Sequence, residues 1–115
     1  METILVVDDE ADIRTVVRGM LTAKGYVVFE TSDPQEALRM AEQQPVHLLL
    51  TDVVMPLMKG TELAQRLCAR SPWTKVLLMS AYKVSDVTAS GLPFIVKPFS
   101  PDALADRVRQ VLAQP

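Results

Sequence analysis

Three acidic residues and one lysine in this sequence have the types and spacing to do chemistry together, because each closes a short, largely apolar run. Asp8 and Asp9 follow the first run, Asp52 follows the second, and Lys97 follows the third. The runs span residues 4–7, 48–51 and 94–96. In an open parallel sheet the carboxyl ends of the strands line one crevice, so these four side chains are expected to meet there.

Carboxylates gathered at one point repel one another unless a cation lies among them, and Mg²⁺ prefers such hard oxygen ligands. A lysine beside them indicates that a further anion binds at the same place. A phosphoryl group is the natural candidate, because its transfer requires positive charge around its oxygens. The charged residues therefore predict a site that binds a phosphoryl group, with Mg²⁺ as the cofactor.

The elements that would position these residues alternate between short apolar runs and longer amphipathic stretches, as in repeated βα units. Runs that are apolar at every residue fit strands covered by helices on both faces. With right-handed crossovers, the pattern predicts a doubly wound α/β fold around a five-stranded parallel sheet. The predicted strands are residues 3–8, 27–29, 46–51, 76–79 and 94–96.

Capping signals mark the ends of the helices between the strands. Asp33 and Pro34 form an N-cap followed by a proline at the first helical position, and Ser100 and Pro101 repeat the signal near the C-terminus. The segment 81–93 is short and rich in serine and β-branched residues. These residues lower helix propensity, so the fourth helix is predicted to be about two turns at most, or irregular.

The composition fits one soluble domain. The chain has 115 residues, of which 49% are hydrophobic, and its net charge of −2 gives no sign of a nucleic-acid footprint. Cys68 is the single cysteine, which excludes a disulfide framework and a cysteine-based metal site. No apolar stretch approaches the roughly 20 residues that a membrane span needs, and the first strand begins too early for a signal peptide. We therefore expect a single domain over residues 1–115, located in the cytoplasm.

Together, the residues at the strand ends resemble those of the response-regulator receiver domain, the phospho-accepting module of two-component signalling. The resemblance covers essentially the whole chain and extends to receivers of hybrid histidine kinases and to single-domain regulators. It implies a flavodoxin-like sheet of order 2-1-3-4-5, with the site at the switch point between the first and third strands. The matching motifs are Leu5-Val6-Val7-Asp8-Asp9-Glu10, Leu50-Thr51-Asp52 with Met55-Pro56, Ser80-Ala81 and Lys97-Pro98-Phe99.

The resemblance implies a role for each matching residue. Asp52 would accept the phosphoryl group and contribute to the metal site. Asp9 would bind Mg²⁺ directly and Asp8 mainly through water, while the backbone carbonyl of Val54 would complete the protein ligands. Lys97 would pair with Asp52 first and then with the phosphoryl oxygens.

Three further positions follow from the same resemblance. Ser80 would be the switch hydroxyl, and Phe94, three residues before Lys97, would be the switch aromatic. The Lys97–Pro98 bond would often be cis in this family. Glu10 follows the acidic pair but is left outside the predicted ligand set.

These roles imply a signalling module rather than an enzyme with a separate substrate. It would take a phosphoryl group from the phosphohistidine of a histidine kinase or phosphotransfer protein, and catalyse only this transfer and its own slow dephosphorylation. It would then switch conformation to control an output partner or a covalently linked domain, without direct contact with nucleic acid or a membrane. The alternative is a receiver-like adaptor that binds proteins without phosphorylation. The intact acids and lysine argue against it, whereas the unusual fourth helix keeps it open.

Two other proteins of similar topology fit the sequence less well. An aspartate-nucleophile phosphatase would usually carry a second acid two residues after the nucleophile, where this chain has Val54. A flavodoxin would need a hydroxyl-rich phosphate loop after the first strand, where this chain has acids that would repel the FMN phosphate.

One departure bears on the lifetime of the phosphorylated state. Val54 and Tyr82 lie two residues after Asp52 and Ser80, at positions that border the phosphoryl group in this family. Their bulk and apolar character are predicted to exclude attacking water. A relatively long-lived phosphoaspartate is therefore expected.

Overall fold

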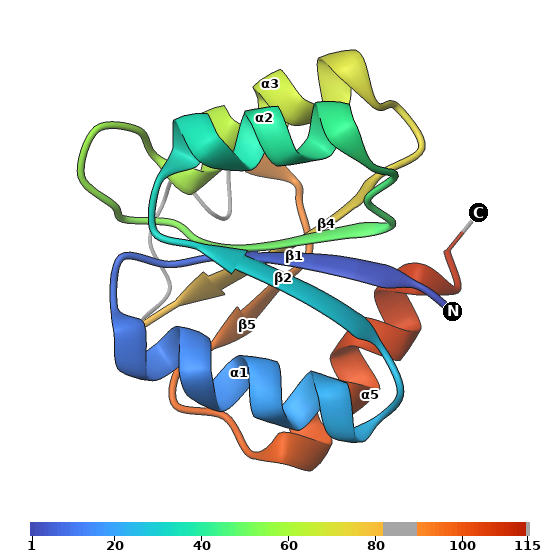
Figure 1. Cartoon of the computed structure of the whole chain (residues 1–115). Coiled ribbons are helices and arrows are strands. Elements are labelled where there is room, and N and C mark those ends of the chain that lie inside the picture. Colours follow the sequence, from blue (N-terminus) through green and yellow to red (C-terminus); the bar gives the residue numbers. More distant parts are fainter. Residues whose placement is uncertain (82–89, 115) are drawn as a thin grey trace.

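The strands form one sheet in the order β2-β1-β3-β4-β5, as seen in the computed structural model, which describes residues 1–81 and 90–114 (Figure 1). Each neighbouring pair of strands is parallel. The strands are β1 (Thr3–Val7), β2 (Val27–Thr31), β3 (Leu48–Asp52), β4 (Lys75–Ser80) and β5 (Phe94–Val96). The predicted doubly wound sheet and its order are confirmed. The switch point therefore lies between the carboxyl ends of β1 and β3.

Within the described residues, two helices cover each face of the sheet (Figure 1). The helices are α1 (Ala11–Ala23), α2 (Pro34–Gln43), α3 (Gly60–Arg70) and α5 (Pro101–Leu112). The helices α1 and α5 lie on one face, and α2 and α3 lie on the other. The prediction of a short or irregular fourth helix falls largely on residues 82–89, which lie outside the described residues.

Both predicted caps are confirmed. The side chain of Asp33 accepts a hydrogen bond from the backbone N–H of Gln35 at 2.9 Å, and Ser100 Oγ accepts one from Ala103 at 3.0 Å. In each case the capping oxygen satisfies one of the backbone donors that a helix leaves without an intrahelical partner. The sequence signals for α2 and α5 thus mark the first helical turn correctly.

The central strands are apolar at every residue because both of their faces are buried. Along β1, Leu5 and Val7 pack into the layer beneath α2 and α3, while Ile4 and Val6 pack into the layer beneath α1 and α5. All four side chains are fully buried. Burying a branched aliphatic side chain contributes about 1.5–3 kcal/mol, so the two layers hold β1, and with it the adjacent turn, firmly in place.

Four of the five strands have bounds that differ from those predicted, since β1 ends at Val7 rather than Asp8 and β4 gains one residue at each end. The strand β2 extends two residues beyond Phe29, because Glu30 and Thr31 continue the ladder with β1. The strand β3 begins at Leu48, where its register with β1 starts, rather than at Val46. Backbone pairing decides how far a strand runs, and apolar character alone does not reveal it.

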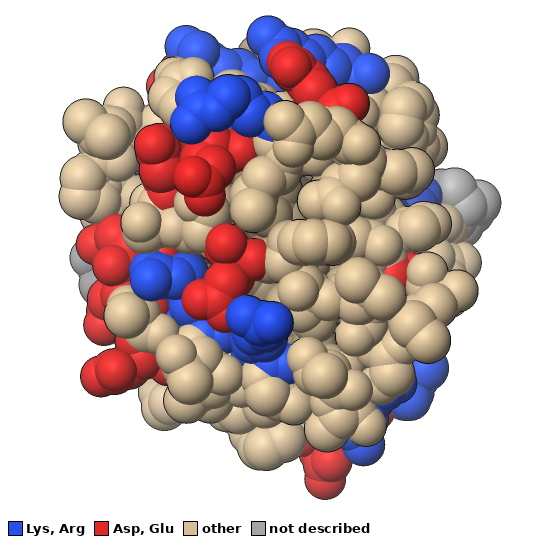
Figure 2. Space-filling view, in the orientation of Figure 1, with Lys and Arg blue, Asp and Glu red and all other residues tan. Residues whose placement is uncertain are grey.

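Charged side chains of both signs share the surface. On the face shown in Figure 2, lysine and arginine lie beside aspartate and glutamate rather than in one continuous basic patch. Exposed pairs such as Arg66–Glu62 and Arg109–Asp106 contribute little to stability, because water and salt screen them. Among the helices of the described ranges, none has both the length and the apolar character needed to cross a membrane.

Candidate functional site

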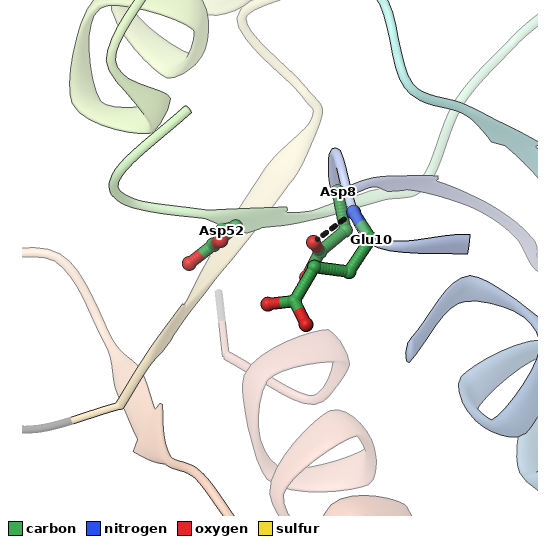
Figure 3. Close-up of side chains that lie close together, drawn as sticks. All are labelled: Asp8, Glu10 and Asp52. Carbon is green, nitrogen blue, oxygen red and sulfur yellow. Dashed lines mark hydrogen bonds between the residues drawn. The ribbon is translucent and has the colours of Figure 1, made fainter. Parts of the chain in front are cut away.

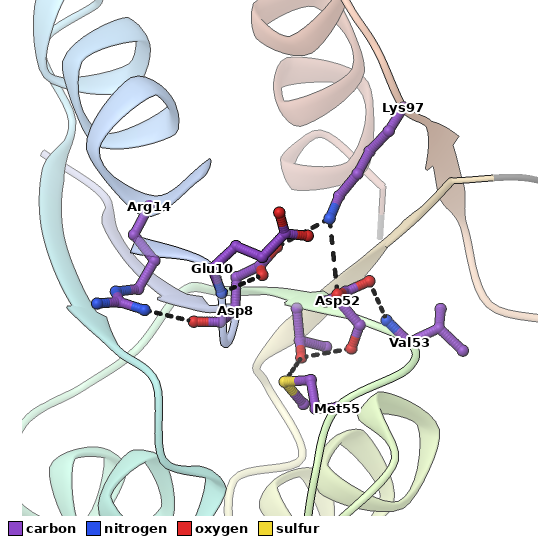
Figure 4. A network of polar contacts seen from close by, with 8 residues as sticks. Asp8, Glu10, Arg14, Asp52, Val53, Met55 and Lys97 are labelled. Carbon is purple, nitrogen blue, oxygen red and sulfur yellow. Dashed lines mark hydrogen bonds and ion pairs between the residues drawn. The ribbon is translucent and has the colours of Figure 1, made fainter. Parts of the chain in front are cut away.

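The carboxyl ends of three strands bring charged side chains together, as the sequence predicted. Asp8 directly follows β1, Asp52 is the last residue of β3, and Lys97 directly follows β5. Lys97 Nζ donates to Asp8 Oδ2 at 2.9 Å and lies 3.6 Å from Asp52 Oδ2 (Figure 4). The lysine therefore bridges two carboxylates from strands that meet at the switch point.

The third carboxylate at this point belongs to Glu10. One carboxylate oxygen each from Asp8, Glu10 and Asp52 lies within 4.8 Å of the others (Figure 3). Asp9 is exposed and is not part of this group. The backbone N–H of Glu10 donates to Asp8 Oδ1 at 2.9 Å, which closes a tight turn after β1. Direct binding of Mg²⁺ by Asp9 stays a prediction.

Glu10 is the site residue that sequence reasoning left out. Three successive acids follow the first strand, and their spacing alone does not show which side chains turn inward. The signal for Glu10 lies in Asp8, because an aspartate often accepts a hydrogen bond from the N–H two residues later. Such a turn places the third acid, rather than the second, beside the first.

The negative charge of Asp52 is only partly balanced by its surroundings. Its side chain is only 12% exposed, and its Oδ1 accepts a hydrogen bond from the backbone N–H of Val53 at 2.9 Å. Burial raises the pKa of Asp52 above its ordinary value, and the charge of Asp8 raises it further, against the opposing effects of Lys97 and Val53. An additional cation beside Asp52 would therefore favour its ionised form.

Lys97 is held as an ammonium. Burial by itself lowers its pKa, but the hydrogen bond to Asp8 and the negative charges of Asp52, Asp8 and Glu10 outweigh this effect and raise the pKa above its ordinary value. The peptide bond from Lys97 to Pro98 is cis, as the family resemblance implied. Lys97 thus carries a full positive charge at neutral pH, next to Asp52.

The chemistry of this donor set fits Mg²⁺. Three carboxylates supply hard oxygen ligands, while the ammonium of Lys97 balances only one of the three negative charges. A divalent cation would remove the remaining repulsion. Asp8, Glu10 and Asp52 are therefore able to hold the metal that the sequence predicted.

The two predicted switch residues lie on β4 and β5. Ser80 ends β4, is buried, and accepts a hydrogen bond from the backbone N–H of Lys97 at 2.6 Å through its carbonyl oxygen. Phe94 begins β5, pairs with Leu78 and is half-buried. Val54, the predicted carbonyl ligand, is the second residue after β3 and exposes 67% of its surface. Their roles in switching and metal binding stay predictions.

Gly60, the first residue of α3, lies against the backbone of the site. Its N–H donates to the carbonyl of Val53 at 2.8 Å. A Cβ atom at this position would lie 2.0 Å from the backbone oxygen of Asp52, far inside van der Waals contact. Glycine therefore allows the start of α3 to lie directly against the end of β3.

Gly60→Ala is expected to destabilise the protein by about 1–3 kcal/mol, the usual effect of forcing an extra methyl group into packed surroundings. Because the clash falls on the backbone of Asp52, the variant is also expected to disturb the site. Thermal unfolding measures the first effect, and the backbone NMR shifts of Asp52 and Val53 measure the second.

Gly19→Ala is the matched control. Gly19 lies inside α1, and a Cβ atom there meets nothing within 4 Å. Alanine is expected to stabilise the helix at this position by about 0.5–1 kcal/mol. Equal effects of the two substitutions would contradict the assigned role of Gly60.

Comparison with known proteins matches this geometry to one family. A family model described as the response regulator receiver domain matches residues 4–109. The probable transcriptional regulator ycf27 of Porphyridium aerugineum is 38% identical over 115 residues, which cover 96% of this chain and 48% of that protein. The chain thus spans about half the length of the curated relatives it matches.

Solved structures give the same result. The receiver domain of the hybrid histidine kinase CckA is 36% identical, with a TM-score of 0.83, and the match covers 96% of this chain and 98% of that chain. The response regulator TrrA of Thermotoga maritima, solved in complex with Mg²⁺ and BeF, is 31% identical. Its TM-score is 0.86, and the match covers 96% of this chain and 99% of that chain.

Proposed function

The chain belongs to the response regulator receiver domain family, and we propose that Asp52 is the residue that accepts the phosphoryl group. The observation that carries this assignment is the position of Asp52, a buried carboxylate 3.6 Å from the ammonium of Lys97 and beside two further acids. We assign residues 1–115 to a single receiver domain. It acts as a signalling module in a two-component phosphorelay.

In the proposed reaction, a carboxylate oxygen of Asp52 attacks the phosphorus of a phosphohistidine on a histidine kinase or phosphotransfer protein. The new O–P bond forms as the P–N bond breaks, and the electron pair of that bond returns to the imidazole nitrogen. Such transfers depend mainly on positioning and on stabilising charge on the phosphoryl oxygens. The ionised form of Asp52 is the nucleophile, so cations that favour its ionisation also favour the reaction.

Lys97 supplies fixed positive charge to this step. In the resting protein its ammonium contacts Asp8 and Asp52, and we propose that it also pairs with the phosphoryl oxygens after transfer. Bound Mg²⁺ would neutralise the same oxygens. Asp8, Glu10 and Asp52 would hold the metal, together with the backbone carbonyl of Val54. Asp9 would join them if the turn after β1 rearranges around the metal.

Phosphorylation is proposed to change the conformation near β4 and β5. The added charge would favour movement of the Ser80 hydroxyl toward the phosphoryl group, and Phe94 would follow into the vacated space. A bias of a few kcal/mol is needed for an efficient switch. The altered surface would control an output partner or a linked domain, and we place the reaction in the cytoplasm.

The comparisons bear on two further expectations. They favour the phosphorylated receiver over the adaptor that does not use phosphorylation, because the whole acidic group and lysine accompany the family match. The expectation of no contact with nucleic acid finds no support, because ycf27 is named a transcriptional regulator and is about twice as long as this chain. We do not retain that expectation.

Labelling with acetyl phosphate or phosphoramidate tests the proposal, with intact mass as the readout. One phosphoryl group is expected on the folded protein in the presence of Mg²⁺. Chelation of the metal with EDTA is expected to remove the labelling and restored Mg²⁺ to return it. A well-folded protein that binds Mg²⁺ without acquiring phosphate would favour the adaptor instead.

The lifetime of the phosphoaspartate supplies a second test. Val54→Asn replaces an exposed apolar side chain beside the site with one that can hold water, and it is expected to speed hydrolysis about tenfold, or about 1.4 kcal/mol in activation free energy. Decay is measured by intact mass after removal of the phosphodonor. Val27→Asn, on an exposed valine at the start of β2, is the control and is expected to leave the decay rate unchanged.

An unchanged decay rate in Val54→Asn would contradict the water-excluding role. The companion residue in that prediction, Tyr82, lies outside the described residues. Its effect is tested by Tyr82→Ala in the same assay.

A further inference from the structure

Arg14 is a nearly buried cation beside the acidic group, and the proposed reaction does not use it. Its Nη1 donates to the backbone carbonyl of Asp8 at 2.7 Å (Figure 4). Its Nε donates to Glu30 Oε1 at 3.4 Å, and only 17% of its side chain is exposed. We propose that Arg14 is a positioning residue, which fixes the turn after β1 so that the carboxylates of Asp8 and Glu10 face Asp52.

In the turn that Arg14 contacts, Asp8 is held both at its backbone and at its carboxylate. The backbone N–H of Asp8 donates to the carbonyl of Thr31 at 3.3 Å, and its carbonyl accepts from Arg14. Its two carboxylate oxygens accept from the N–H of Glu10 and from Lys97 Nζ, each at 2.9 Å. The first pair of contacts fixes the backbone, and the second pair fixes the direction of the carboxylate.

The contact with Arg14 gives the backbone carbonyl of Asp8 a hydrogen-bond donor. The strand β1 ends at Val7, so the Asp8 carbonyl lies beyond the last residue of the strand, in a residue that is fully buried. A buried carbonyl requires a donor, and a charged donor gives a stronger hydrogen bond than a neutral one. Arg14 supplies this donor from α1, across the turn that it stabilises.

An arginine suits this place better than a lysine. The planar guanidinium presents several donors in a fixed arrangement, so that one side chain contacts both the Asp8 carbonyl and the Glu30 carboxylate. Glu30 lies on β2, next to β1 in the sheet. The ion pair thus anchors Arg14 to the neighbouring strand while its other donor reaches the turn.

Arg18 provides a matched comparison one helical turn later. It lies 3.6 Å from the other carboxylate oxygen of Glu30, but 59% of its side chain is exposed. Removal of Arg18 therefore deletes the same charge from the same helix and a contact with the same glutamate. It leaves the hydrogen bond from Arg14 to Asp8 in place.

The test compares Arg14→Ala with Arg18→Ala by ¹H–¹⁵N NMR, first without metal and then in a titration with Mg²⁺. In Arg14→Ala, the amide resonance of Glu10 is expected to move upfield, because its hydrogen bond to the Asp8 carboxylate loosens. Mg²⁺ is expected to bind about 10-fold more weakly, the lower end of the effect seen when a group that orients a metal ligand is removed. Arg18→Ala is expected to leave both quantities near their wild-type values.

The inference is overturned if the Glu10 amide stays in place and both variants bind Mg²⁺ equally well. If Arg14→Ala does not fold, Arg14→Lys replaces it, because lysine keeps the charge and loses the planar guanidinium. The same direction of change is expected there. The metal readout rests on the proposed function, whereas the Glu10 amide shift does not. Wild-type protein that binds no Mg²⁺ would contradict the proposed function, and the amide shift would still decide the role of Arg14.

Discussion

Asp52→Asn is expected to abolish phosphoryl labelling and, in metal-free protein, to raise the free energy of unfolding at neutral pH. The first effect follows because the amide oxygen is too weak a nucleophile to accept the phosphoryl group. The second follows because the carboxylate of Asp52 is buried beside the charge of Asp8, and asparagine removes that repulsion without a change of shape. The gain is expected to be on the order of 1 kcal/mol, within the usual range for a single substitution.

The difference in the free energy of unfolding between the wild-type protein and Asp52→Asn is expected to change with pH in one direction. The pKa of Asp52 is raised by folding, so the folded protein holds the proton more tightly than the unfolded chain. The favourable contribution of the protonated group is fully present below the unfolded pKa of about 3.9, and it is lost as the pH rises through the higher folded pKa. The two proteins should therefore differ little below about pH 4, and the asparagine variant should become the more stable one as the pH rises.

Urea unfolding of both proteins across this pH range measures the difference, with EDTA present. Addition of Mg²⁺ is then expected to stabilise the wild-type protein by about 2.7 kcal/mol at a hundredfold excess over its dissociation constant. The asparagine variant should gain less, since it has lost one charged ligand. A wild-type protein that is the more stable of the two at neutral pH without metal would contradict this account of Asp52.

Lys97→Met is expected to slow labelling by about 100-fold at saturating Mg²⁺. This is the lower end of the decrease in rate that follows when one preorganised hydrogen-bond donor to a reacting oxyanion is removed. Methionine keeps the apolar stem and removes only the ammonium, which lies 3.6 Å from Asp52. The rate of the mass shift with acetyl phosphate measures the effect. Lys24→Met, on an exposed lysine at the end of α1, is the control for the loss of one positive charge.

The same substitution leaves the fully buried Asp8 without its ammonium partner, so stability must be measured alongside the rate. Loss of one partner from a buried pair destabilises a protein. Lys97→Arg keeps the charge and is expected to retain the fold while labelling more slowly than the wild-type protein, because the guanidinium is broader than the ammonium. Labelling of Lys97→Met at the wild-type rate would remove Lys97 from the reaction.

The sequence alone was sufficient for the parallel sheet and for the meeting of Asp8, Asp52 and Lys97 at one edge of it. Apolar runs separated by amphipathic stretches predicted the parallel sheet, since strands buried on both faces leave that pattern. Asp8, Asp52 and Lys97 were predicted to meet because each closes such a run, and parallel strands end at one edge. The caps at Asp33 and Ser100 were also correct, because capping depends on a few neighbouring residues.

Only the tertiary structure decided how the individual side chains face. It turned Glu10 rather than Asp9 toward Asp52, through a hydrogen bond to Asp8 that the spacing of three successive acids does not reveal. It placed Arg14 against the Asp8 carbonyl and Gly60 against the backbone of Asp52. Periodicity shows which residues are buried. These contacts are short in sequence separation but depend on the backbone conformation of the turns after β1 and β3 and on the packing of α1 and α3 against the sheet.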